Sequence, residues 1–282
     1  MSESSRRSFF RGAFQSAARA ALRAEPEPVR EEIVAPLLSD TEIERYSRQL
    51  VLEDWSEEAQ TRLRDASVLV VGAGALGSPV ALYLAGAGVG RIGLVDSDVV
   101  ELSNLHRQPL HFSPDLGVPK VESAAAKLRF LNPDTLVEPY QVRLDETNAA
   151  GLVEGQDLVI DCSDTFATRY AVNRACCDAG VDLIEGGAIG WSGMVMTILP
   201  QATACYRCAF PVEPTDAPSC AQAGVLGPTA GVIGALQALE ALKVLSSTQP
   251  PLLDAFLNID LVTLEFTPVS VYRDKDCPDC GG

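Results

Sequence analysis

The chain has 282 residues, of which 47% are hydrophobic, and its formal net charge at neutral pH is −16. This length allows one sizeable α/β domain with an appendage or two small domains, and the lack of any run of 18 apolar residues argues against a membrane partner. Because so acidic a chain would repel a phosphate backbone, we expect no nucleic-acid partner. The eight cysteines are unevenly spaced and include C-x-x-C pairs, which favours reduced thiols and metal binding over a disulfide scaffold and predicts a cytoplasmic protein.

Residues 1–38 are predicted to form a basic, disordered N-terminal arm and linker. Arg6 and Arg7 resemble a twin-arginine export signal, but Arg19 and Arg23 interrupt the apolar stretch that such a signal requires. The segment "AEPEPVREE" that follows cannot bury much surface and is typical of a linker. We expect one folded domain over residues 39–282, with a change of pattern near residue 190.

The folded part begins with a β/α alternation. Residues 39–65 have the apolar spacing of a helix, with an N-cap at Ser39 or Asp40. Strands are predicted at 68–71, 91–95, 136–140, 158–161 and 182–184, and helices at 78–88, 121–131, 146–154 and 165–179. This alternation predicts a Rossmann-like α/β fold with a mainly parallel sheet and helices on both faces. Beyond residue 190, "WSGMVMTIL" and "AFLNIDLVTLEFTPVSVY" predict antiparallel strands that flank one long apolar helix, "GVIGALQALEALKVLSS".

A glycine-rich turn follows the first apolar strand. Gly72, Gly74 and Gly77 form G-x-G-x-x-G between a strand and a helix, and Asp96 ends the next strand. In the dinucleotide-binding fold such glycines allow close approach to phosphate, and the acid accepts hydrogen bonds from ribose hydroxyls. The motif predicts an adenine-nucleotide site and does not distinguish NAD from ATP.

Polar residues that follow the glycine turn favour ATP. A triphosphate requires cations near its phosphates and a carboxylate for magnesium, whereas hydride transfer requires a flat apolar pocket and a general acid. The only imidazoles in the chain are His106 and His111. The candidates to bind the nucleotide from segments beyond the sheet's carboxyl edge are Asp98, Asn104, Arg107, Gln108 and Lys120, with Asp161 and Asp164 after a buried strand.

Four cysteines form the pattern C-x₂-C…C-x₂-C, at positions 205, 208, 277 and 280. Two such pairs predict a closed, tetrahedral, structural zinc site with Cys205, Cys208, Cys277 and Cys280 as ligands. We expect this zinc knuckle to hold the C-terminal strands against the segment that follows "MVMTILP".

Nine motifs, in order between about residues 41 and 281, resemble the MoeB/ThiF (HesA/MoeB/ThiF) family, the prokaryotic relatives of ubiquitin-activating enzymes. They are "RYSRQ" (45–49), "GAGALG" (72–77), "LVDSDVVELSNLHRQ" (94–108), "VPKVES" (118–123), "DCSD" (161–164), "CYRC" (205–208), "AGVLGP" (223–228), "GVIGALQALEALK" (231–243) and "CPDC" (277–280).

The resemblance implies an enzyme that uses ATP and Mg²⁺ to adenylate the C-terminal Gly-Gly carboxylate of a ubiquitin-like, MoaD- or ThiS-like sulfur carrier protein, with release of pyrophosphate, for molybdopterin- or thiamin-type sulfur transfer. It divides the domain into a nucleotide-binding part (about 66–190) and a carrier-binding and zinc part (about 191–282). By similarity Gly74 lies against the phosphates, Asp96 holds the ribose, and Asp164 holds Mg²⁺ or orients the α-phosphate. Asn104, Arg107 and Lys120 would contact the phosphates.

The resemblance also implies a homodimer in which Arg48 reaches the triphosphate bound by the partner subunit. Cys220 lies in a proline-rich loop and matches a cysteine that accepts the acyl group in some family members and is dispensable in others. Thr165 stands where the family usually has asparagine. With no sulfurtransferase domain after Gly282, we expect a separate protein as sulfur donor. The alternative functions are an NAD-dependent oxidoreductase and a non-catalytic module that binds a ubiquitin fold.

Overall fold

The computed structural model describes residues 37–213 and 223–281. The predicted arm therefore lies outside the described residues, except for Leu37 and Leu38. Leu38 is already buried, with 1% of its surface exposed, so the packed core includes a residue just before the predicted start of the domain.

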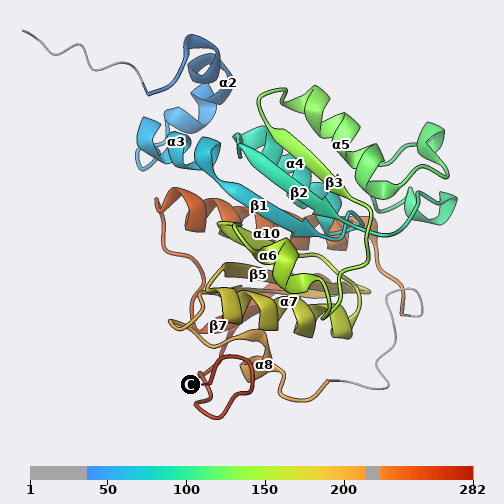
Figure 1. Ribbon diagram of the computed structural model, residues 1–282, viewed down its shortest axis with the longest axis vertical. Coiled ribbons are helices and arrows are strands. Elements are labelled where there is room, and N and C mark those ends of the chain that lie inside the picture. Colours follow the sequence, from blue (N-terminus) through green and yellow to red (C-terminus); the bar gives the residue numbers. More distant parts are fainter. Residues whose placement is uncertain (1–36, 214–222, 282) are drawn as a thin grey trace, which may run out of the picture. The chain divides into compact units, whose positions relative to one another are not determined.

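One eight-stranded sheet runs through the described residues in the order β3-β2-β1-β4-β5-β6-β7-β8. Strands β3 to β5 in this order are parallel, and β5 to β8 are antiparallel, as predicted. The fold is thus the predicted Rossmann-like sheet continued by antiparallel strands (Figure 1). The strands are β1 (Ser67–Val71), β2 (Arg91–Val95), β3 (Leu136–Tyr140), β4 (Leu158–Asp161), β5 (Asp182–Ile189), β6 (Ser192–Ile198), β7 (Ala255–Asp260) and β8 (Glu265–Ser270).

Helices cover both faces of the sheet, and each face has its own apolar layer (Figure 1). Helices α4 (Gly77–Ala87), α5 (Lys120–Leu131) and α10 (Gly227–Ser246) pack on one face, where Val68 and Val70 of β1 point. Helices α6 (Ala149–Val153), α7 (Phe166–Ala179) and α8 (Tyr206–Ala209) pack on the other, against Leu69 and Val71. Alternate residues of β1 thus enter opposite layers, as the two-residue period of a strand requires.

Four predicted boundaries are wrong. Helix α10 starts at Gly227, four residues before the predicted segment, and has a proline in its first turn. Residues 39–65 form two helices, α2 (Asp40–Leu50) and α3 (Glu57–Asp65), because Ser56 caps a second start after the first helix ends. Helix α6 is shorter than predicted. Strand β5 continues to residue 189 through Gly186, where a Cβ would lie 2.2 Å from the side chain of Gln237 on α10, so glycine here permits a close approach and does not end the strand.

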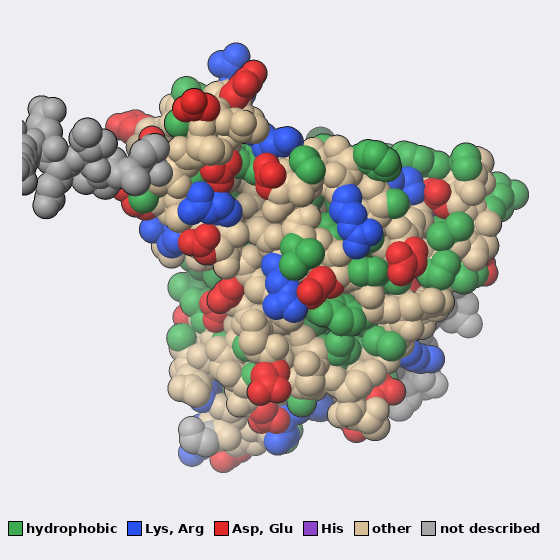
Figure 2. Space-filling view, turned by 45° about the horizontal axis from the view of Figure 1, so that its top comes forward, with side chains coloured by type: hydrophobic (Ala, Val, Ile, Leu, Met, Phe, Trp, Pro, Cys, Tyr) green, Lys and Arg blue, Asp and Glu red, His purple; other side chains and the backbone are tan. Residues whose placement is uncertain are grey.

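Helix α10 is the one helix of the described residues that is long and apolar enough to span a membrane by length and composition alone, and half of it is buried inside the protein. It packs against α4, β5 and β6, as a core helix does. Figure 2 shows acidic side chains interspersed with basic ones on the face that it displays, so the charge of −16 is not gathered into one patch there.

Candidate active site

A cavity of about 430 Å³ opens at the carboxyl ends of β1, β2 and β4. Parallel strands place the residues that follow them along one edge of the sheet, which is where ligands bind in open α/β folds. Two of the residues predicted to bind the nucleotide from this chain do not line the cavity: Gly77, and Asp161, which is fully buried beneath it. Those that line it are Gly72, Gly74, Asp96, Asp98, Asn104, Arg107, Gln108, Lys120 and Asp164.

The glycine turn after β1 forms one wall of the cavity. Gly72 has φ +95°, and a Cβ there would lie 2.9 Å from the carbonyl oxygen of Cys162. A Cβ on Gly77 would lie 1.8 Å from the carbonyl oxygen of Gly72, so Gly77 lets α4 start directly against the turn. Gly74 faces the cavity, with the Gln108 amide nitrogen as the nearest atom to an added Cβ. The first and third glycines shape the turn, and the second leaves its backbone open to a ligand.

Asp96 braces the same turn. Its Oδ2 accepts a hydrogen bond of 2.8 Å from the backbone nitrogen of Ala73, and its Oδ1 accepts one of 2.8 Å from the backbone nitrogen of Asp98. Burial raises the pKa of the Asp96 carboxyl, and the nearby Lys120 ammonium opposes this rise. Asp96 therefore has a structural role beside the ribose contact that the sequence predicted.

Two of the four cationic side chains that line the cavity, those of Arg107 and Lys120, come from the segment that follows β2. Lys120 begins α5, is 6% exposed, and its Nζ lies 2.8 Å from Oδ2 of Asp98. Arg107 follows a short 3₁₀ helix, η1 (Leu102–Asn104), and donates to the carbonyl oxygen of Ser103 at 2.7 Å. Asn104 is buried and accepts from the backbone nitrogen of Glu101, which stabilises this turn.

Gln108 supplies an unused polar atom at the cavity. Its side chain is buried, and its Oε1 has no hydrogen-bond partner within residues 37–213 and 223–281. Because a buried amide oxygen without a donor is costly, it marks a place where a ligand group or water belongs. The buried His111 does not line the cavity, and both of its ring nitrogens have hydrogen-bond partners. Nε2 lies 2.9 Å from the carbonyl oxygen of Ala73, and Nδ1 lies 2.9 Å from Oγ of Ser123.

Asp164 stands on the opposite side, in the loop between β4 and α7, and its side chain is exposed. Thr165 is the N-cap of α7, with its hydroxyl accepting from the backbone nitrogen of Thr168. Threonine at position 165, where the family usually has asparagine, therefore still caps the N-terminus of α7.

Arg48 does not line this cavity and is exposed on α2. Other residues of its "RYSRQ" motif are structural: Gln49 donates to the carbonyl oxygen of Ala87, and the Tyr46 hydroxyl accepts from Asn132. The sequence alone did not assign these two side chains a structural role. Cys220 lies outside the described residues.

The four predicted zinc ligands come together away from the cavity. Their Sγ atoms all lie within 4.8 Å of one another, with Cys205 3.8 Å from Cys208 and 3.7 Å from Cys277, and Cys208 3.4 Å from Cys280. Four sulfurs about 2.3 Å from a tetrahedral zinc are about 3.8 Å apart, so these positions fit the metal.

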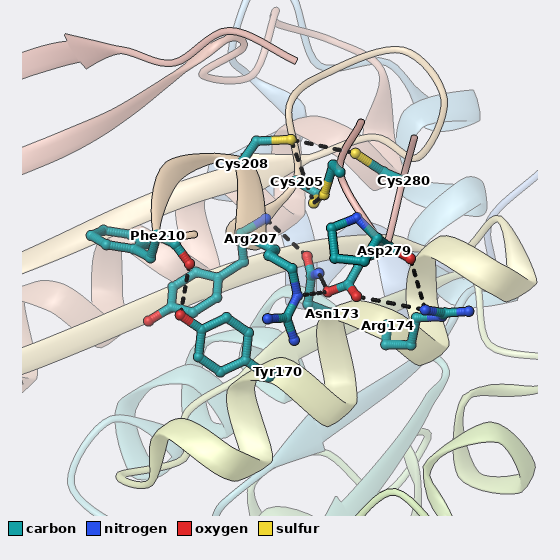
Figure 3. A network of polar contacts seen from close by, with 12 residues as sticks. Tyr170, Asn173, Arg174, Cys205, Arg207, Cys208, Phe210, Asp279 and Cys280 are labelled. Atoms are coloured by element: carbon teal, nitrogen blue, oxygen red, sulfur yellow. Dashed lines mark hydrogen bonds and ion pairs between the residues drawn. The ribbon is translucent and has the colours of Figure 1, made fainter. Parts of the chain in front are cut away.

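The buried carboxylate of Asp279 joins the two C-x₂-C pairs (Figure 3). Oδ2 of Asp279, between the last two cysteines, accepts 2.8 Å hydrogen bonds from Asn173 on α7 and from Arg207 between the first two. Asn173 also accepts from the backbone nitrogen of Tyr206 at 2.9 Å. The two C-x₂-C pairs are thus both fixed to α7 through the side chain of Asn173. Only the cysteines of this network were predicted.

Comparisons with known proteins identify a family, similar sequences and a similar solved structure. The ThiF family matches residues 46–279. The chain is 46% identical over 247 residues to the sulfur carrier protein adenylyltransferase of Thermus thermophilus, covering 85% of this chain and 91% of that protein. It is 44% identical over 246 residues to the SAMP-activating enzyme E1 of Haloferax volcanii, covering 86% and 91%. The solved structure of MccB from E. coli with ATP is similar, with a TM-score of 0.77 and 25% identity over 84% of this chain and 75% of that one.

Proposed function

This chain belongs to the ThiF family, and from that premise we propose that it is an adenylyltransferase. It would join the C-terminal carboxylate of a ubiquitin-like sulfur carrier ending in Gly-Gly to the α-phosphate of ATP and release pyrophosphate. The names of its relatives support this activity, since one adenylates a sulfur carrier protein and another is an activating enzyme E1. A cytoplasmic location belongs to the same proposal.

The observation that carries the proposal is the composition of the cavity. Arg107 and Lys120 lie on one side and Asp164 on the other, with the open backbone of Gly74 between them. Of the described residues that line it, none is a histidine. Cations and a carboxylate suit a magnesium-bound triphosphate, whereas hydride transfer would require an apolar surface and an acid.

The chemistry requires little from the protein beyond placement and charge. The carrier's carboxylate is ionised at neutral pH, so no general base is required for its attack on phosphorus. Arg107 and Lys120 would offset the charge that builds up on the phosphates, and Asp164 would hold Mg²⁺, which draws electron density from the phosphate oxygens when bound. Asp96 and the glycine turn would fix the ribose and the α-phosphate in line with the attacking oxygen.

We include in the proposal a homodimer in which Arg48 acts on the partner subunit's triphosphate. Its exposure on α2, outside the cavity of its own chain, supports this role. Mixing Arg48→Ala with Asp164→Ala chains tests it: hybrid dimers would contain one intact site, so random reassembly should restore roughly a quarter of wild-type activity. If Arg48 acted within its own chain, every mixture would stay inactive.

Zinc completes the proposal as a structural ion held by Cys205, Cys208, Cys277 and Cys280, and its support is the match between their spacing and tetrahedral coordination. Cys220 is a possible acceptor of the acyl group. Cys220→Ala should leave ATP–pyrophosphate exchange unchanged, whichever way the later transfer responds, because adenylation precedes any attack by sulfur.

Carrier-dependent exchange of labelled pyrophosphate into ATP tests the whole proposal. We expect exchange only when a ubiquitin-fold carrier ending in Gly-Gly is present, and none when its last glycine is removed. ATP with Mg²⁺ should raise the melting temperature, and NAD should not. Stabilisation by NAD would favour an oxidoreductase, and carrier binding without exchange would favour a non-catalytic module. If exchange is observed, we propose that a separate sulfur donor protein reacts with the acyl-adenylate in the next step.

A further inference from the structure

Three buried charged side chains lie beneath the cavity and have no part in the chemistry above. Asp161 ends β4, and Glu185 is its register partner on β5. Both carboxyl groups are fully buried. Arg169, on the first turns of α7, is 8% exposed and reaches the cavity. Buried charges are expensive, so their arrangement needs a physical reason.

Asp161 and Arg169 hold the backbone of one residue, Ser163, and Glu185 holds Arg169. Asp161 Oδ1 accepts from the backbone nitrogen of Ser163 at 2.7 Å, and Arg169 Nη2 donates to the carbonyl oxygen of Ser163 at 2.8 Å. The other end of the guanidinium, Nη1, is held by Glu185. Both backbone polar groups of Ser163 are therefore fixed, and the next residue in the chain is Asp164.

The same group contains two carboxyls and one cation. Asp161 Oδ2 and Glu185 Oε2 are both buried and have no hydrogen-bond partner among the described residues, and the register of β4 and β5 places the two residues side by side. An ionised carboxylate only accepts hydrogen bonds, so neither carboxylate can satisfy the other, whereas a proton on one of them would let it donate to its neighbour. Desolvation raises the pKa of both groups, and of Glu185 well above its ordinary value, while Arg169 opposes the rise.

Among the residues that the structure describes, no second cation faces the pair. The titratable and charged groups that face the pair from the elements packed against it are Arg169 and Cys176 of α7, Tyr206 of α8 and Cys162 next to β4. Helix α10 contributes the neutral Gln237, which donates to the Asp161 carbonyl oxygen at 2.7 Å. With one proton retained, the set of two carboxyls and one guanidinium has no net charge.

We propose that Asp161, Arg169 and Glu185 form a clamp that positions Asp164 at the cavity, and that the two carboxyl groups of the clamp share one proton at neutral pH. These three are positioning residues, since they act on Asp164 through Ser163. Only the effect on Mg²⁺ rests on the proposed function. The shared proton can be tested in the protein alone.

Infrared spectroscopy of the full chain tests the proton. A protonated buried carboxyl has a C=O stretch separate from that of a carboxylate. We expect wild type minus Glu185→Gln to show this acid band at neutral pH, and wild type minus Glu240→Gln to lack it. Glu240 is the matched control because it is also buried but fully paired, by Thr197, Lys243 and the backbone nitrogen of Leu252. Asp161→Asn should remove the same band, because the remaining carboxyl would then ionise against Arg169.

No acid band in the difference spectra of Glu185→Gln and Asp161→Asn would overturn the shared proton. Either variant suffices if the other fails to fold.

The positioning role has a separate test. In Glu185→Leu, the guanidinium loses its anchor, and the half-saturating Mg²⁺ concentration for pyrophosphate exchange should rise by roughly 10–100-fold. Glu185→Gln keeps an amide that can bond both neighbours, so it should stay near wild type at neutral pH. An unchanged Mg²⁺ requirement in Glu185→Leu would overturn the positioning role. If the wild type itself showed no exchange, the proposed function would fail, while the infrared result would still decide on the proton.

Discussion

Replacement of Gly77 by alanine tests the claim that helix α4 must start directly against the glycine turn. The added Cβ would lie 1.8 Å from the carbonyl oxygen of Gly72 and 2.8 Å from its carbonyl carbon. These are backbone atoms within the turn, so they cannot rotate away as the end of a flexible side chain could. Overpacking of this kind costs about 1–3 kcal/mol of unfolding free energy.

Gly86, about two and a half turns further along α4, is the matched control. It is exposed, and nothing lies within 4 Å of a Cβ built on it. Alanine there should stabilise the protein by about 0.4–1 kcal/mol, because Gly86 lies in the last turn of the helix and alanine reduces the freedom of the unfolded chain. The two variants make the same chemical change in the same helix and should differ in stability by about 1.4–4 kcal/mol.

Urea unfolding followed by circular dichroism measures both variants, and a melting-temperature shift with ATP and Mg²⁺ measures binding. Gly77→Ala should unfold at lower urea than wild type and lose its ATP-induced shift, because Gly72 and Gly74 move with the displaced turn. Gly86→Ala should keep the full shift. Equal stability of the two variants would refute the steric reasoning, and a full ATP shift in Gly77→Ala would refute the placement of the nucleotide.

Three further predictions concern other parts of the fold. Lys120→Met should slow carrier-dependent pyrophosphate release by roughly 10²–10³-fold with saturating carrier, on the scale of a lost transition-state donor, and an unchanged rate would remove Lys120 from the site. Burial lowers the pKa of His111, so the stability that its neutral form contributes is present above the ordinary value of about 6.5 and is lost as pH falls through the lower folded value. His111→Gln should flatten the decline in urea midpoint below about pH 6.5, and an equally steep decline would assign it to other groups. Asp279→Ala should weaken zinc binding by about 10–100-fold in competition with a chelator, since Asn173 and Arg207 lose their common acceptor, whereas the exposed Asp276→Ala should not.

Much of the sheet could be predicted from the sequence because its strands carry local signals. The apolar runs at Val68 and Leu158 end at residues that turn the chain, and the structure assigns strands there within a residue of the prediction. One error came from a local signal that was missed, the N-cap at Ser56, and another arose where packing overruled a local signal. Gly186 favours a turn by propensity, yet the approach of Gln237 from α10 retains it within β5.

The same distinction applies to the candidate site. Asp96, Lys120 and Asp164 were predictable because each follows a strand or starts a helix at the carboxyl edge. Glu185 was not, since a lone acid inside an apolar strand has meaning only once β5 pairs with β4 and brings it opposite Asp161. The one sequence signal for Glu185 was its charge immediately after the apolar end of a predicted strand. Arg48 depends on a second subunit and stays a prediction.

Helix α7 bears on both the candidate cavity and the predicted zinc site. Its first turns carry Thr168 and Arg169 at the cavity, and one turn later Asn173 holds Asp279 between the last two cysteines. Asn173 lies at the middle of α7 (Phe166–Ala179), so the cysteine cluster braces this helix one turn beyond the residues that reach the cavity. Strand β5 pairs with the parallel strand β4 on one edge and with the antiparallel strand β6 on the other, so it joins the two parts of the sheet. Loss of zinc should therefore loosen the cavity through α7 before it disrupts the sheet.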